Sequence, residues 1–314
     1  MPLDKTSFMV YGDIDGHEIL LCIMKTSEVI KKLQSLDLSK YPLNDIISLI
    51  HNFENIKIIR LTISPGAIIT RLRKGWGYME RAELSYPPVK NCTVCQRATL
   101  PNQTMFYGTI SDSDTPTIDN RAIGLSECST LARKGKTSKG IEYFTVSTWC
   151  LTKAIQVVAI VDDVAFENVR NNRMLDLAKT KFEECKLQPD FEEYARFVAT
   201  EFSKPVDYDY DYLISAAIAD AYINDVRFDG IAYPSVRIGG QAGMNIALAP
   251  KVADESLMLV RTAELTYYKN EAHGLCIVNR VSDIQTWSYS ECQYPSDSEI
   301  AKLIHVETLD DLEK

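Results

Sequence analysis

The sequence predicts an α+β fold in which short strands form a core flanked by helices. The chain has 314 residues, of which 46% are apolar and 25% are charged, a composition typical of soluble globular proteins. Runs rich in β-branched residues occur along it, and so do segments with apolar residues at helical spacing. The two kinds of segment do not alternate as regularly as in a doubly wound sheet, which favours the α+β class.

The first sixty residues predict a strand or a hairpin followed by two helices. Residues 4–24 alternate weakly and end in the apolar run 19–24. Thr26-Ser27-Glu28 is typical of a helix start, and apolar residues follow at helical spacing. Residues 42–53 repeat this helical pattern. We expect the helical pair to serve as a lid or as an oligomer contact.

The rest of the chain contains further strands and helices. Strands are predicted at 57–62, at 63–70 (interrupted by Ser64-Pro65-Gly66), and at 141–146, 155–161 and 257–267. The run 155–161 is nearly unbroken and is therefore expected at the centre of a sheet. Helices are predicted at 166–184, 190–202 and 211–225, and the last of these directs Leu213, Ile214, Ala217, Ile218 and Ala221 inward. Residues 84–105 and 111–121 are expected to be irregular.

Charge and cysteine content limit the classes of partner. The net charge is −9, so we expect no direct nucleic-acid binding, which requires a basic face. No apolar run reaches the roughly 18 residues of a membrane span. The first residues also lack the features of a secretory signal. The sequence therefore predicts a cytoplasmic protein that does not associate with a membrane. Among the eight cysteines only Cys92 and Cys95 have metal-ligand spacing. A structural zinc site needs four ligands, and the sequence offers no second ligand pair, so we predict no metal site.

Residues 229–237 form the most informative segment. An apolar pair runs into a turn fixed by Pro234, and this turn presents Ser235 and Arg237 close together. Three glycines follow between 239 and 243, where they allow the backbone to approach a ligand or another strand closely. The segment then continues as Asn245-Ile246-Ala247-Leu248.

Four other features precede this segment in a fixed order. They are Arg71-Leu72-Arg73 after an apolar run, Arg97 shortly before Pro101, the aromatic pair Phe106-Tyr107, and a helix start that runs from Ala122 to Glu127. This order resembles that of the RES family, small bacterial proteins named for one Arg, one Glu and one Ser. The resemblance covers roughly residues 60–265. The chain departs from shorter family members by a polar insertion at 112–120, which lengthens the Tyr107–Glu127 spacing.

The resemblance implies a fold and a division of the chain. RES proteins have a core similar to that of ADP-ribosyltransferases. The chain would then comprise an N-terminal helical extension at 1–58, a RES-like catalytic domain at 59–268 and a C-terminal extension at 269–314.

The resemblance also implies that the chain binds and consumes NAD. The sequence has no Gly-x-Gly-x-x-Gly turn after an early strand, and this absence favours NAD as a substrate over NAD as a redox carrier. No other cofactor is expected. The chain also lacks a complete P-loop, a His-Glu-x-x-His motif and a Gly-x-Ser-x-Gly motif.

Cleavage of the nicotinamide–ribose bond would need three kinds of group. Guanidinium groups would bind the pyrophosphate. Arg71 and Arg97 are the first candidates for this role, and Arg73 and Arg237 are the second. The carboxylate of Glu127 would face the developing ribosyl cation. By resemblance, Tyr107 would hold the nicotinamide and Ser235 would orient the carboxamide or a phosphate.

Each of these residues also has a purely structural interpretation. Arg71 and Arg73 are expected to alternate on a strand, so that one of them, preferably Arg71, faces the site. Tyr107 could belong to the core, Ser235 could satisfy a turn, and Ser126 could cap a helix. The dipole at a helix start favours a residue such as Glu127 without any catalytic role.

The function predicted from the resemblance is an NAD glycohydrolase or phosphorylase that acts as a bacterial toxin or defence effector. One alternative is an ADP-ribosyltransferase acting on a protein, and another is a non-catalytic module that senses NAD or ADP-ribose. The expected partners are NAD, an Xre-type antitoxin and further copies of the chain. The sequence leaves open the acceptor and the choice between NAD and NADP.

Overall fold

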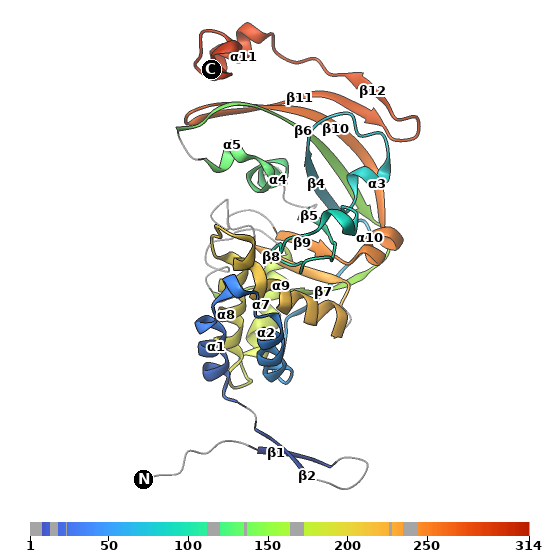
Figure 1. Cartoon of the computed structure of the whole chain (residues 1–314). Helices are drawn as coiled ribbons and strands as arrows, with labels where there is room; N and C mark the ends of the chain where they lie inside the picture. The colour runs from blue at the N-terminus through green and yellow to red at the C-terminus, as the bar shows by residue number, and fades with distance from the viewer. Residues whose placement is uncertain are drawn as a thin grey trace.

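The central element of the fold is a mixed sheet with the strand order β12-β11-β10-β6-β4-β5-β9-β8-β7-β3 (Figure 1). The structure is a computed structural model that describes residues 8–12, 18–22, 24–111, 120–134, 137–163, 173–225, 228–234 and 244–313. Within these residues, β7 and β8 pair in parallel and the other neighbouring strands pair antiparallel. The α+β class predicted from the sequence is confirmed.

The strands of the sheet come from most of the chain. Their bounds are β3 (Arg60–Ile63), β4 (Ile68–Lys74), β5 (Phe106–Ser111), β6 (Lys139–Leu151), β7 (Ile155–Ala159), β8 (Gly230–Pro234), β9 (Met244–Leu248), β10 (Leu257–Asn270), β11 (His273–Asp283) and β12 (Ser288–Glu291). A separate antiparallel hairpin is formed by β1 (Phe8–Gly12) and β2 (Glu18–Cys22).

The helices are mostly short. Their bounds are α1 (Thr26–Ser35), α2 (Leu43–Ile50), α3 (Arg81–Leu84), α4 (Asn120–Cys128), α5 (Thr130–Arg133), α7 (Arg173–Cys185), α8 (Phe191–Ser203), α9 (Leu213–Asp220), α10 (Pro250–Ser256) and α11 (Asp297–Leu303). Single helical turns lie at η1 (Leu38–Lys40), η2 (His51–Phe53), η3 (Val89–Asn91), η5 (Asp209–Tyr212), η6 (Ala221–Asp225) and η7 (Leu309–Leu312).

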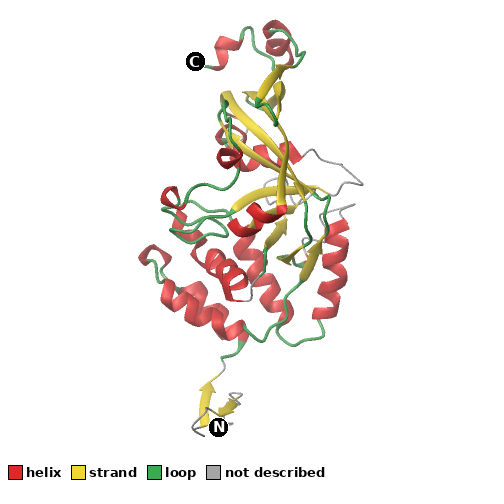
Figure 2. Cartoon of the chain, turned by 90° about the vertical axis from the view of Figure 1, so that its right-hand side faces the viewer, coloured by secondary structure: helices red, strands yellow, loops and turns green. Residues whose placement is uncertain are grey.

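The half of the sheet that contains β5, β9, β8 and β7 is covered on both faces. Successive side chains of a strand point to opposite faces, and the two faces belong to different apolar clusters. Val158 and Ile231 pack with the side chains of α1, α2, α8 and α9 on one face. Val157 and Ala232 pack with the side chains of α7 and α10 on the other. Viewed from the side, the helix-rich half and the strand-rich half are stacked (Figure 2).

Helices α4 and α5 cover the long strands instead. Leu125 and Leu131 pack against a third apolar cluster that contains Leu72 of β4 and Phe144 of β6. Gly124 allows the close approach, because a Cβ at this position would overlap the Leu72 side chain. On this face the α4–α5 layer and the layer of α1, α2, α8 and α9 cover different parts of the sheet (Figure 1).

Most of the predicted elements are confirmed. The hairpin, the helices at 26–36 and 42–53, the helix at 190–202 and the strand at 257–267 all form within a few residues of their predicted bounds. The described part of the predicted helix 166–184 is α7. None of the helices in the described residues has the length and hydropathy needed to cross a bilayer.

One prediction about local structure is wrong, and another is confirmed with a change of helix type along the segment. Strand β7 lies next to the edge strand β3 rather than at the centre of the sheet, and its apolar run reflects the helices on both of its faces. The predicted helix 211–225 divides into η5, α9 and a π-helical turn, η6. Leu213, Ile214, Ala217 and Ile218 are buried as expected, and Ala221, at the start of the π-turn, is only partly buried.

Candidate functional site

The candidate site lies where β4 and β5 part. These two strands pair only from Ile68–Ser111 to Thr70–Thr109. Beyond this point β4 continues beside β6 and β5 continues beside β9. We call the opening between residues 71–74 and 106–108 the fork. Since backbone groups inside it have lost their ladder partners, they are open to other donors and acceptors.

Arg71 fills the fork. Its Nη1 donates a hydrogen bond to the carbonyl oxygen of Tyr107 at 2.5 Å, and its Cζ lies 5.5 Å from the ring centroid of Phe106. Its Nε is buried and has no hydrogen-bond partner among the described residues. Burial lowers the pKa of Arg71 to about 10, so the guanidinium is still a cation at neutral pH.

Tyr107 lies on the opposite side of β5 from Phe106 and packs against the cluster of α8 and α9. Its hydroxyl shares a hydrogen bond with the hydroxyl of Thr99 and accepts a hydrogen bond from the Ala98 amide at 3.3 Å. Burial raises the pKa of Tyr107 to about 12, so the phenol stays protonated. Residues of the irregular segment 92–105 therefore hold the Tyr107 hydroxyl in place.

Glu127 lies in the last turn of α4, which corrects the prediction that it follows a helix start. Its Oε1 accepts a hydrogen bond from Asn245 Nδ2 at 3.2 Å. Ser126 donates to the Ile123 carbonyl inside the same helix and does not cap it. The dipole at a helix C-terminus disfavours a carboxylate, so the helix dipole does not explain Glu127 at this position.

Tyr233 and Asn245 join the predicted residues into one neighbourhood. They face each other across β8 and β9, and both are buried. Burial raises the pKa of Tyr233 well above its ordinary value; Tyr107 and Glu127 raise it further, and Arg97 opposes them. All three predicted side chains therefore lie within electrostatic range of the Tyr233 hydroxyl.

The thiol of Cys128 connects Arg71 to the same neighbourhood. It donates to the Leu72 carbonyl at 3.5 Å. Burial raises the pKa of this thiol, the charge of Arg71 lowers it, and the charge of Glu127 raises it. The charges of Arg71 and Glu127 therefore both act on the thiol at the end of α4.

The remaining arginines differ in their surroundings. Arg97 donates to the Phe202 carbonyl and lies over the ring of Tyr212, with Cζ 5.1 Å from the centroid, so it joins the group around Tyr233. Arg73 lies over the ring of Tyr78, with Cζ 5.0 Å from the centroid. The premise that Arg71 and Arg73 alternate is wrong, because residues two apart on a strand point to the same face. Arg71 nevertheless enters the fork, whereas Arg73 packs on Tyr78.

Ser235 and Arg237 lie outside the described residues, as do the glycines between 239 and 243. Of the predicted residues, the structure brings Arg71, Arg97, Tyr107 and Glu127 to the fork and its borders. The sequence argument did not assign roles to Tyr233 and Asn245. Tyr233 precedes Pro234 in the chain and Asn245 pairs with Tyr233. The informative segment was therefore identified from the sequence, and the contribution of these two side chains was not.

Neither a scan of protein-family models nor a search of curated proteins finds a match to this chain.

Proposed function

We propose that this chain is an NAD-consuming enzyme that cleaves the bond between nicotinamide and ribose. Its core would be of the ADP-ribosyltransferase type, as the resemblance to RES proteins implies. The transferred ADP-ribosyl unit would pass to water or inorganic phosphate, and the biological role would be that of a bacterial toxin or defence effector with an antitoxin as its partner.

The observation that carries the proposal is the unpaired cation in the fork. Among the described residues no carboxylate pairs with Arg71, and its hydrogen bond to the Tyr107 carbonyl reaches a neutral acceptor. Arg71 is partly buried, and a cation that is partly withdrawn from water gains from an anionic partner, because desolvation without compensation is costly. A pyrophosphate would supply the missing anion, and guanidinium groups bind phosphate oxygens in a bidentate manner.

The other groups of the site fit the proposed bond cleavage. The ribose carbon C1′ loses the nicotinamide, whose ring nitrogen keeps the bonding electron pair and becomes neutral. Water then attacks C1′ and releases a proton. The intermediate stage is a ribosyl cation, as in glycoside hydrolysis. The carboxylate of Glu127, oriented by Asn245, would stabilise this cation, and no strong acid is required for the neutral leaving group.

The test is the release of nicotinamide from NAD by the purified chain. Glu127→Gln keeps the size of the side chain and removes its charge, so we expect the rate to fall at least about a hundredfold. Glu193→Gln, an exposed change on α8, is the matched control and should leave the rate unchanged.

Two outcomes would contradict the proposal. If the wild-type chain binds NAD and never releases nicotinamide, the non-catalytic sensor is the correct interpretation. If NAD does not bind at all, the fork serves another anion. A mass spectrum of the products with and without phosphate would identify the acceptor, including a protein side chain.

A further inference from the structure

A cavity lies away from the fork, behind the segment that leads into β3. It has a volume of about 420 Å³ and lies between residues 50–60, α8 and the π-helical turn η6. This volume is within the range of small-molecule sites. None of Arg71, Arg97, Tyr107 and Glu127 lines it.

The walls of this cavity combine apolar surface with positive charge. Phe53 and Tyr194 pack with their ring centroids 4.8 Å apart, and Ile56 lines the same space. Lys57 and Arg60 are exposed, which places their charges where the cavity opens to solvent. The acidic Glu54 opposes them there, so the opening has a net positive charge in a chain whose own net charge is −9.

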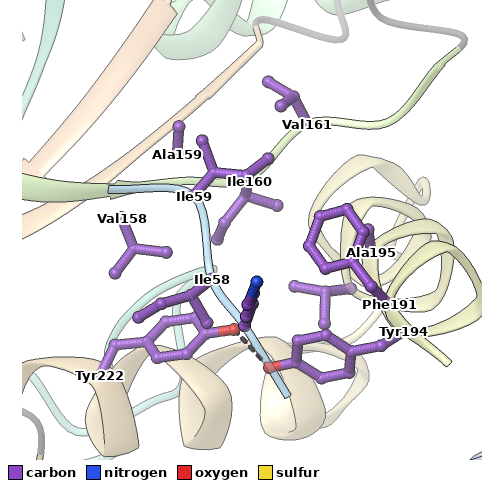
Figure 3. A pocket seen from close by; sticks show the side chains of 12 residues that line it. Ile58, Ile59, Val158, Ala159, Ile160, Val161, Phe191, Tyr194, Ala195 and Tyr222 are labelled. Carbon is purple, nitrogen blue, oxygen red and sulfur yellow. Dashed lines mark hydrogen bonds between the residues drawn. The ribbon is translucent and has the colours of Figure 1, made fainter. Parts of the chain in front are cut away.

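Two of the residues that line this cavity, Tyr194 and Tyr222, are buried tyrosines. Tyr194 and Tyr222 share one hydrogen bond between their hydroxyl groups (Figure 3). Burial raises the pKa of Tyr194 to about 12 and that of Tyr222 well above its ordinary value, so both stay protonated. Each hydroxyl group carries one proton, and the hydrogen bond between the two groups uses only one of these protons. The second hydroxyl proton has no acceptor among the described residues.

The same residues line a smaller cavity. Lys57, Tyr194 and Tyr222 border a space of about 20 Å³ that Figure 3 shows among Ile58, Ile160 and the helix α8. Its volume suits roughly one water-sized group. These three side chains therefore border both the larger cavity and the smaller one.

The backbone at this place is irregular in a way that is common at functional sites. The π-turn η6 follows α9 directly, and its first residues, Ala221 and Tyr222, form part of the cavity wall. The amide of Phe228 donates to the Tyr222 carbonyl at 3.1 Å and closes the turn. Isolated π-turns are rare in helices and often lie beside binding sites.

We propose that this cavity binds a small amphipathic anion. The apolar body would lie against Phe53, Ile56 and Tyr222. The anionic head group, a carboxylate or a phosphate, would accept the unused tyrosine proton and face Lys57 and Arg60. This site does not depend on the function proposed for the fork.

Isothermal titration calorimetry of the full-length chain without NAD tests the site with octanoate, octyl phosphate and 1-octanol. We expect both anions to bind at least roughly tenfold more tightly than the neutral alcohol. The difference between the two anions reports which head group fits better. Since the readout is direct binding, failure of the enzymatic proposal would leave this result unaffected.

Variants separate the head group from the apolar body. Lys57→Gln combined with Arg60→Gln should weaken octanoate binding about tenfold and leave octanol unchanged. Ala221→Leu should fill the cavity and weaken both, with circular dichroism to verify folding. Lys90→Gln combined with Lys153→Gln, at exposed positions elsewhere, is the matched control.

Three results would overturn the proposal. The first is an absence of octanoate binding at millimolar concentration. The second is octanol binding as tight as octanoate binding. The third is an equal loss of affinity in the Lys90 and Lys153 control, which would show that general charge attracts the anion.

Discussion

At the scale of single residues, the partly buried Arg71 and the buried Glu142 are two charges in different surroundings. Arg71 meets a neutral carbonyl and the face of an aromatic ring. Glu142, on β6, accepts hydrogen bonds from Ser129, Thr130 and Lys74. A fully satisfied ion is typical of a structural role, whereas an unsatisfied one is typical of a site that waits for a ligand.

The surroundings of Glu142 predict how the stability of the fold depends on pH. Burial opposes its charge, but the hydrogen bonds from Ser129, Thr130 and Lys74 outweigh burial and lower its pKa from 4.5 to about 2. The folded pKa lies below the unfolded one, so the stabilisation is complete above pH 4.5 and is lost as the pH falls towards 2. We expect Glu142→Gln to lower the free energy of unfolding by about 2–3 kcal/mol at pH 7.

Urea unfolding at pH 7 and at pH 3 would measure this difference. The gap between wild type and Glu142→Gln should narrow at the lower pH. Glu313→Gln, at an exposed position near the C-terminus, should be indistinguishable from wild type at both. A gap that is equal at pH 7 and pH 3 would refute the charge-based explanation.

At the scale of elements, the position of α4 decides the geometry of Glu127. The sequence pattern places a helix near residue 122, and the structure extends it from Asn120 to Cys128. Glu127 therefore lies at the end of the helix that faces β9, where Asn245 holds it. The polar segment that precedes α4 gives no periodic signal, so the sequence could not fix where the helix begins.

The close pairing of β8 with β9 predicts that a larger residue at Gly230 lowers the stability of the fold. A Cβ at Gly230 would overlap the Ala247 carbonyl and lie 2.8 Å from Leu248 Cδ2. Because a backbone carbonyl cannot rotate away, Gly230→Ala should push the two strands apart and cost about 2–3 kcal/mol. Chemical denaturation would measure the loss, and the displaced Tyr233 and Asn245 should also weaken binding at the fork.

Gly77→Ala is the comparison for this change. Its added Cβ would meet no atom within 4 Å, and the cost would come from its φ of +84° alone. We expect about 1–2 kcal/mol for that backbone strain, with no effect on the fork. If Gly230→Ala is as mild as a surface substitution, β8 and β9 are not as closely packed as described.

At the scale of the whole molecule, the fork lies at the border between two helical layers on one face of the sheet. Tyr107 and Tyr233 belong to the layer of α8 and α9, and Glu127 comes with the layer of α4 and α5. Residues more than a hundred positions apart therefore meet at the fork. This arrangement is typical of sites formed between packed elements.

A test in bacteria addresses the molecule as a whole. Expression of the chain in a bacterial host should deplete cellular NAD and arrest growth, and Arg71→Ala should relieve both, because the pyrophosphate loses its cation. NAD content and growth rate are the measurements. Arg196→Ala, an exposed arginine on α8, should remain as toxic as wild type. Unchanged toxicity of Arg71→Ala would contradict the pyrophosphate role.

The sequence by itself determined the class of fold and most of the elements. Apolar periodicity is a local property, and it correctly placed α1, α2, α8, β10 and the first hairpin. The candidates Arg71, Arg97, Tyr107 and Glu127 came instead from the resemblance of the sequence motifs to those of RES proteins. Apolar periodicity misplaced β7, since a run buried by helices reads the same at any position in a sheet.

Only the tertiary structure decided how the selected residues meet. The parting of β4 from β5 is a matter of which strands pair, and pairing depends on contacts between distant parts of the chain. The same is true of the partnership between Asn245 and Glu127 and of the cavity beside η6. Local periodicity cannot predict such contacts, because they form only when the elements pack together.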